Sequence, residues 1–157
     1  MDAVWFWLHI AGTVGFIAVH GEQAIAMFRI RAAQHDRATI EALTERSKAK
    51  TARSYAALGV IVVSGSAAGI HGSEFGEAWL WAAIIVLLVT VGLMSVTATP
   101  WMKRLRYGCT RWANGTYAMD DDELAQTIQG PAPAIVAATG VVGLLIILFL
   151  MFAKPGA

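Results

Sequence analysis

The sequence has little charge and almost no cysteine, and each shortage excludes a class of protein. Only 15% of its 157 residues are charged, whereas an ordinary soluble domain has about a quarter. Its single cysteine, Cys109, cannot form an internal disulfide, which excludes a small secreted scaffold held together by cross-links. The formal net charge is +1, so the composition gives no indication of a nucleic-acid partner.

The sequence also lacks the features of a cleaved leader. Its start, MDAVWFWLH, has neither the basic region nor the small-residue cleavage site of a signal peptide. We therefore expect the first apolar segment to be retained. Hydrophobic residues make up 57% of the chain. Such a composition is typical of a protein whose outer surface faces the hydrocarbon of a lipid bilayer.

The apolar residues fall into four segments, and a spanning helix needs about 20 residues. Helix is the default conformation in lipid, because every backbone polar group must be paired within the segment. We predict an all-α protein, a single membrane domain over residues 1–157 folded as an antiparallel four-helix bundle. Its expected transmembrane helices are residues 4–30, 53–71, 78–98 and 132–152, with cytoplasmic loops at 31–52 and 99–131.

Charge in the connections predicts the orientation of the bundle. Both longer loops are rich in Lys and Arg, whereas the short connection at 71–77 contains Glu74 and Glu77 and neither basic residue. Basic loops stay in the cytoplasm. The pattern therefore predicts a multi-pass protein of the bacterial inner membrane with both termini outside.

Two stretches of the cytoplasmic loops have the composition of helices. DRATIEALTERSKAK has high helix propensity, and Asp36 is a suitable N-cap for it. We expect it to continue the first helix inward. DDDELAQTIQGPAP predicts a short helix with acidic residues at its start, ended by Gly130 and Pro131.

The first apolar segment carries polar side chains that a lipid-facing helix does not need, namely His9, His20, Glu22 and Gln23. At about 100° per residue, His9, His20 and Gln23 share one stripe, and Glu22 lies on a stripe of small residues. Ionisable residues inside a membrane are costly and mark functional sites. Two interpretations stay open: hydrogen bonding to neighbouring helices, or a functional role such as cofactor binding or a proton path.

A cofactor interpretation needs a second ligand for His9. His71 ends the second segment, and in an antiparallel hairpin it is expected near the start of the first. Two imidazoles from different helices are the axial ligands of a b-type haem, so His9 and His71 are candidate haem or metal ligands. Copper is the alternative, because His9, Met27, Met94 and Met102 are ligand types that suit Cu(I), although they lie at different depths.

The stretches WLHIAGTVGFIAVHG and AWLWAAIIVLLV, together with the glycine-rich second segment, resemble a family of small, uncharacterised bacterial four-helix membrane proteins. More remotely, LHIAG is similar to the start of CopD-type copper-resistance proteins and of four-helix membrane protoporphyrinogen oxidases. The latter resemblance implies haem binding through His9. Those oxidases also use a lysine and a histidine in the third helix, and residues 78–99 contain neither.

Two classes of function follow from the sequence. The first is an accessory or structural subunit of a larger membrane complex, redox or otherwise, which packs against other membrane subunits. The alternative is a b-type haem protein that transfers electrons or handles haem, and a second alternative is a copper-handling protein. The sequence contains no nucleophile constellation or phosphate-binding loop, so it predicts no particular enzyme activity.

Overall fold

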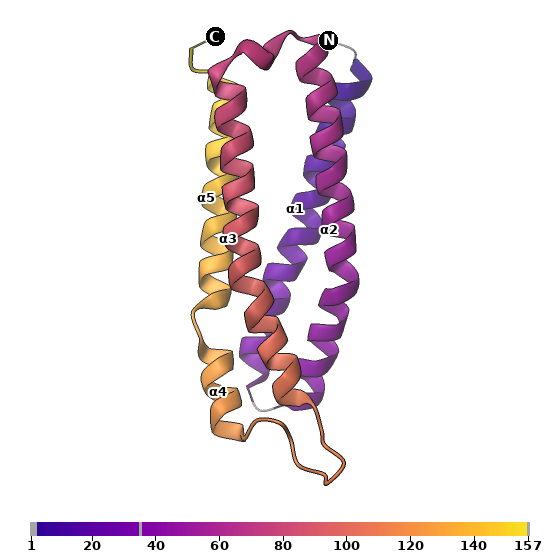
Figure 1. Ribbon diagram of the computed structural model, residues 1–157, viewed down its shortest axis with the longest axis vertical. Coiled ribbons are helices and arrows are strands. Elements are labelled where there is room, and N and C mark those ends of the chain that lie inside the picture. The colour runs from indigo at the N-terminus through magenta and orange to yellow at the C-terminus, as the bar shows by residue number, and fades with distance from the viewer. Residues whose placement is uncertain (1–2, 35, 157) are drawn as a thin grey trace.

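The computed structural model describes residues 3–34 and 36–156, and it is built almost entirely of helices (Figure 1). Among these residues, the β-type backbone pairing is limited to one isolated antiparallel bridge between Arg111 and Tyr117. The elements in chain order are α1 (Ala3–Ala33), α2 (Arg37–His71), the 3-10 turn η1 (Glu74–Gly76), α3 (Ala78–Cys109), α4 (Asp121–Gln129) and α5 (Ala132–Ala153).

Four helical stretches of the described chain are long and apolar enough to cross a membrane: Ala3–Ala33, Arg37–His71, Ala78–Cys109 and Asp121–Ala153, the last comprising α4 and α5. The prediction of an all-α fold with four apolar helices is confirmed. At about 1.5 Å per residue, α1, α2 and α3 exceed the roughly 30 Å of a hydrocarbon core. Part of each helix must therefore tilt or project beyond a bilayer.

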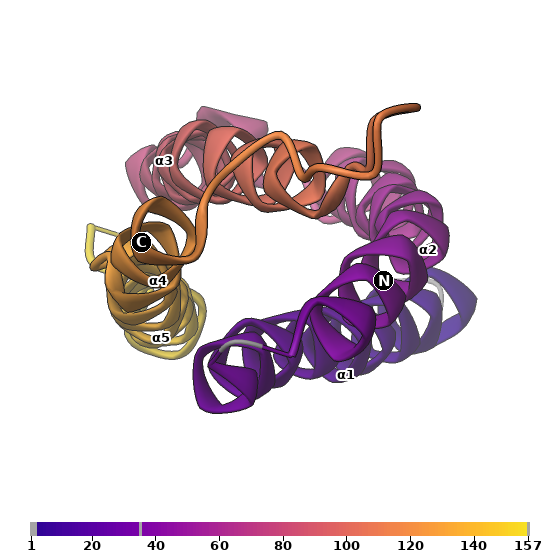
Figure 2. The ribbon, with the colours of Figure 1, turned by 90° about the horizontal axis from the view of Figure 1, so that it is seen from below.

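Successive long helices run in opposite directions, and they form two pairs (Figures 1 and 2). α1 packs along α2, α3 packs along α5, and contacts between the pairs are fewer. The second pair is held close by glycine, because a Cβ added to Gly143 of α5 would overlap the side chain of Thr90 on α3. Small residues permit such backbone approach where no hydrophobic effect drives helices together.

The buried core lies at one end of the molecule and not along its length. Its fully buried side chains are Ile30, Ile40, Leu105, Leu124 and Ile128, which come from α1, α2, α3 and α4. The remaining lengths of the long helices expose many large apolar side chains, as lipid-facing helices do. A buried core at one end, with apolar side chains exposed along the remaining helix length, is the pattern expected of a protein that lies partly in lipid.

The same end carries both basic segments (Figure 1). The chain turns back near Gln34, whose φ is +48°, and α2 begins at Arg37 with Asp36 as its N-cap. The start of α1, the end of α5 and η1 lie at the opposite end. The prediction that the two basic connections share one end is therefore consistent with the fold.

The helices run beyond the predicted spans at this end. DRATIEALTERSKAK is helical with Asp36 as its N-cap, as predicted, but the expectation that it extends the first helix is wrong, because it forms the start of α2. Likewise α3 continues through Pro100 to Cys109. The short helix in the second basic segment is confirmed as α4, with Asp120 as its N-cap and Gly130 following its last residue.

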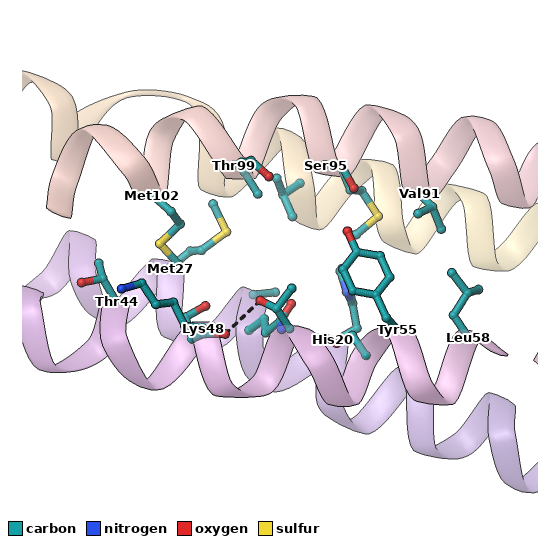
Figure 3. Close-up of a pocket in the computed structure, with 18 of the residues that line it drawn as sticks. His20, Met27, Thr44, Lys48, Tyr55, Leu58, Val91, Ser95, Thr99 and Met102 are labelled. Carbon is teal, nitrogen blue, oxygen red and sulfur yellow. Dashed lines mark hydrogen bonds between the residues drawn. The ribbon is translucent and has the colours of Figure 1, made fainter. Parts of the chain in front are cut away.

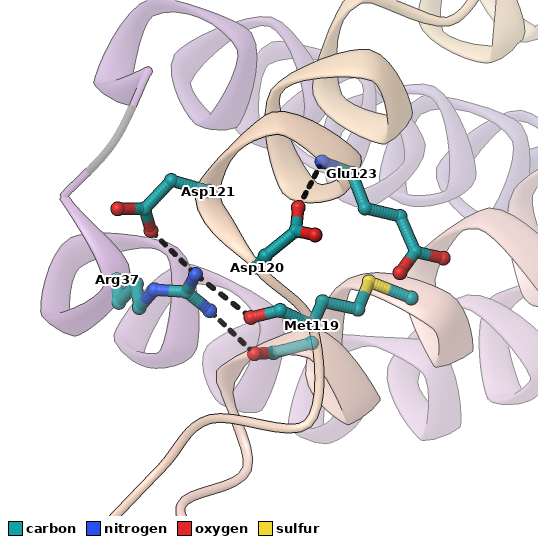
Figure 4. Close-up of polar contacts among 6 residues, drawn as sticks. Arg37, Met119, Asp120, Asp121 and Glu123 are labelled. Carbon is teal, nitrogen blue, oxygen red and sulfur yellow. Dashed lines mark hydrogen bonds and ion pairs between the residues drawn. The ribbon is translucent and has the colours of Figure 1, made fainter.

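Arg37 joins the start of α2 to the connection before α4 (Figure 4). Its guanidinium donates to the carbonyl oxygens of Gly108 (2.6 Å) and Met119 (3.0 Å) and to Oδ1 of Asp121 (2.6 Å). It also lies 4.3 Å from the centroid of the Tyr117 ring. Because a guanidinium offers several donors in a fixed fork, one side chain fixes the 110–120 connection against α2.

Candidate functional site

A cavity of about 340 Å³ lies between the two helix pairs. All the long helices contribute to its wall, most of it from α1, α2 and α3, with Val136 from α5 (Figure 3). On the α1 side the wall contains Phe16, His20, Gln23 and Met27. These residues fall on the stripe that the sequence predicts for His20 and Gln23, and the structure turns that stripe toward the cavity.

The α2 wall follows a helical repeat of small polar and amphipathic residues. It consists of Thr44, Ser47, Lys48, Thr51, Ser54, Tyr55 and Leu58, spaced three or four residues apart as one face of a helix requires. Across the cavity α3 presents Val91, Ser95, Thr99 and Met102 (Figure 3). The two walls therefore combine hydroxyl groups with apolar surface.

Three buried polar atoms around the cavity have no hydrogen-bond partner among the described residues: Nε2 of His20, Nε2 of Gln23 and Oγ of Ser54. Ser54 is only 8% exposed. The His20 ring stacks on Phe16, with centroids 5.4 Å apart, which fixes its plane without satisfying its nitrogen. Buried polar groups are nearly always paired, so three unpaired atoms around one cavity set this region apart.

The polar character of the wall changes along the helix axes. Lys48 and Arg106 lie at the end nearer the buried core, whereas Phe16, Leu58 and Val91 lie at the other end. None of the described lining residues is an aspartate or a glutamate. Lys48 also pairs with Glu45, one turn earlier on α2, at 2.7 Å, and both side chains of that pair are half exposed. The cavity is thus cationic at one end and apolar at the other.

The structure does not bring His9 and His71 together. Nδ1 of His9 donates to the carbonyl oxygen of Ile61 at 3.1 Å, and its ring lies against Gly65, where a Cβ would come within 3.0 Å. His71 lies ten residues beyond Ile61 on the same helix, or about 15 Å along its axis. The bond leaves Nε2 of His9 as an acceptor, but the predicted pair of axial ligands is not assembled.

Glu22 does not line the cavity. It pairs with Lys50 of α2 at 2.5 Å, which gives its charge a partner on the neighbouring helix. The candidate copper ligands divide in a similar way: Met27, Met94 and Met102 line the cavity, and His9 does not. Met94 and Met102 are eight residues apart, about 12 Å along α3, too far to share one ion.

Most of the α2 wall was not predicted from the sequence. Thr44, Ser47 and Lys48 fall in DRATIEALTERSKAK, which the sequence predicts as a continuation of the first helix, so their alignment with Ser54 and Leu58 is not expected. A recognisable signal is nevertheless present, because Thr44, Ser47, Lys48, Thr51, Ser54, Tyr55 and Leu58 recur at intervals of three and four residues. The repeat becomes apparent when one helix is continued from the N-cap Asp36 through the second apolar segment.

Comparison with known proteins finds no family model, curated protein or solved structure that matches the chain.

Proposed function

We propose that this chain is a multi-pass membrane protein that binds a small polar or amphipathic molecule in the cavity between its helix pairs. The observation that carries the proposal is the set of unpaired polar atoms, His20 Nε2 and Gln23 Nε2 from α1 and Ser54 Oγ from α2, that surround one cavity. A bound molecule with polar atoms would supply the missing partners. The cavity volume lies within the range of small-molecule sites.

The energetic argument is one of magnitude. An unpaired buried polar group costs about 1–3 kcal/mol, and in a membrane no lipid chain can satisfy it. Three such groups together would consume a large fraction of the net stability of a typical domain, about 5–15 kcal/mol. Their partners must come from what fills the cavity, and its mixed polar and apolar lining favours an amphipathic molecule over water alone.

Orientation follows from charge, and it sets the depth of the site. We infer that the basic end lies in the cytoplasm, as loop charge favours. About 20 residues of helix cross the hydrocarbon, and counting them inward from His71 and from Ala78 reaches Thr51 on α2 and Ala98 on α3. Both residues line the cavity, which supports a position across the inner boundary of the bilayer.

The prediction of an accessory subunit is compatible with such a site, because a membrane carrier or sensor often acts on a partner protein. Co-purification from membranes in mild detergent tests for that partner separately. Haem and copper stay predictions from the sequence alone, and the positions of His9, His71 and Met94 give neither of them support.

The experiment compares what co-purifies with three versions of the protein. Ala98→Phe fills the cavity from α3, whereas Val96→Phe adds the same ring at a side chain that is 68% exposed. Bound organic molecules are extracted from each purified protein and identified by mass spectrometry. We expect a molecule retained by the wild type and by Val96→Phe and absent from Ala98→Phe. Identical extracts from all three proteins would contradict the proposal.

A further inference from the structure

We propose that the molecule bound in this cavity is an anionic amphiphile, a carboxylate or phosphate head on a single apolar chain. The inference rests on the function proposed above and specifies its ligand. It follows from the order of side chains along the cavity, which is cationic, then polar, then apolar.

The cationic end selects the charge of the head. Lys48 on α2 and Arg106 on α3 line this end from opposite pairs of helices, and no described lining residue carries a carboxylate. Glu45 neutralises part of the Lys48 charge from the exposed face of α2, whereas no ion pair of Arg106 is present among the described residues. A cationic head would be repelled here, and an anionic head would gain the attraction of both cations.

The middle of the cavity suits the neck of such a molecule. His20, Gln23 and Ser54 hold their unpaired atoms there, one turn or more from Lys48 along the α2 wall. Ester, hydroxyl or carboxyl oxygens could accept from the Gln23 amide and the Ser54 hydroxyl, both of which can donate. The polar atoms therefore belong between the charged head and the chain.

The apolar end selects a chain. From Lys48 to Leu58 the wall runs ten residues, about 15 Å along the axis of α2, and it ends among Phe16, Leu58 and Val91. These three side chains offer nothing to an inorganic anion. The volume of about 340 Å³ lies near the lower limit of small-molecule pockets, so it accommodates one chain better than two.

The depth of the cavity agrees with this assignment. Lys48 and Arg106 lie on the aqueous side of Thr51 and Ala98, at the level of lipid head groups, and Leu58 lies inside the hydrocarbon. An anionic amphiphile in the inner leaflet already has its head and chain at these depths. It would reach the cavity sideways between the helix pairs, where contacts are sparse, without crossing the bilayer.

The test measures retention of defined probes by the purified full chain in neutral detergent, using native mass spectrometry. The probes are oleate, 1-oleoyl lysophosphatidate, monoolein and inorganic phosphate. Lys48→Gln/Arg106→Gln removes the cationic end, and Lys103→Gln removes one charge from an exposed site on the same helix as Arg106, outside the cavity. The double variant Lys48→Arg/Arg106→Lys keeps both positive charges. It shows whether a loss of binding in the Gln variant comes from the lost charge or from a folding defect.

We expect oleate and lysophosphatidate to bind more tightly than monoolein, and their relative affinity to distinguish a carboxylate from a phosphate head. The double Gln variant should weaken binding of the anions roughly 10- to 30-fold, since each interfacial cation contributes about 1 kcal/mol. Lys103→Gln and the charge-conserving pair should bind as the wild type does.

Three results would overturn the inference. Monoolein binding as tightly as the anions, with no effect of the double Gln variant, would show a neutral amphiphile and leave the proposed function intact. Full competition by inorganic phosphate would show that no chain is recognised. Failure of every probe, with a different molecule still lost from Ala98→Phe, would refute the ligand class alone. Equal extracts from the wild type, Val96→Phe and Ala98→Phe would instead refute the proposed site itself.

Discussion

Two buried serines on α2 show how one residue type serves structure and function differently. Ser64 donates its hydroxyl to the carbonyl oxygen of Val60 at 2.5 Å, so its polar atom is paired within the helix. Ser54, about as well buried, has no partner for its Oγ. Ser64 makes the usual hydrogen bond of a serine hydroxyl in an apolar helix, to a carbonyl oxygen one turn earlier. The unpaired hydroxyl of Ser54 is destabilising, and a bound molecule would supply its missing partner.

Ser54→Ala should therefore leave the empty protein as stable as the wild type or make it up to about 1 kcal/mol more stable, because it removes an unpaired polar atom. Ser64→Ala is the matched control and should cost about 0.5–1.5 kcal/mol, since it removes a bond that is made. Thermal unfolding in detergent, after removal of co-purified molecules, measures both. A larger loss for Ser54→Ala than for Ser64→Ala would mean that Ser54 is already satisfied.

Arg37 is the opposite kind of residue, because its side chain is largely buried, only 11% exposed, and multiply paired. Arg37→Ala should destabilise the basic end by about 2–4 kcal/mol, since the carbonyl oxygens of Gly108 and Met119 lose a charged donor. Arg104→Ala breaks an exposed pair with Glu123 and should cost less than about 1 kcal/mol. Urea unfolding of both variants in detergent compares them, and equal losses would mean that Arg37 does not anchor the connection.

At the scale of elements, the pairing of α3 with α5 depends on contact that only glycine allows. Gly143 faces Thr90, and a Cβ there has no room. Gly92 on α3 is a helical glycine with nothing within 4 Å of the same added atom. The two positions receive the same extra methyl group in very different surroundings.

Gly143→Ala should destabilise the α3–α5 pair by about 1–3 kcal/mol through overpacking. Gly92→Ala should be neutral or stabilising by up to about 1 kcal/mol, because alanine is the better helix former. Thermal unfolding in detergent distinguishes them. A neutral Gly143→Ala would show that the pair can separate without loss.

The start of α2 gives the fold a dependence on pH. Asp36 accepts from the backbone N–H and the hydroxyl of Thr39, at 3.2 and 2.6 Å, and these bonds hold the pKa of its carboxyl below the usual value. The stabilisation is therefore complete above the unfolded pKa of about 3.9 and is lost as the pH falls through the lowered folded value.

Asp36→Asn keeps the capping oxygen but removes the charge. It should be less stable than the wild type near neutral pH, and the difference should shrink as the pH falls through the lowered folded pKa of Asp36. Unfolding of both proteins across that range measures it. A difference that is constant with pH would show that the charge of Asp36 contributes nothing.

At the scale of the molecule, topology is the feature that charge predicts. In a background of Cys109→Ala, a Ser73→Cys variant should react with a membrane-impermeant maleimide on intact cells. Asn114→Cys, in the connection at the basic end, should react only after the membrane is permeabilised. The opposite pattern would invert the orientation and move the cavity to the outer leaflet.

The sequence predicted the membrane helices because long apolar runs leave no alternative, and it predicted α4 because Asp120, Gly130 and Pro131 delimit it. It predicted helix after the N-cap Asp36, but not that this helix is continuous with the second apolar segment, since the polar stretch from Arg37 to Lys50 can join either neighbour. The face shared by His20 and Gln23 followed from the turn of α1. What opposes that face depends on the spacing between helix pairs, which no local pattern encodes.

The position of the buried core has a consequence for how the protein is made. α1 and α2 can insert as a hairpin as soon as they leave the ribosome, but Ile30 and Ile40 then face water with nothing to cover them. The rest of their cluster, Leu105 of α3 and Leu124 and Ile128 of α4, is translated later. Until then the nascent protein carries an exposed apolar patch at the membrane surface, where a chaperone or an insertase would find it.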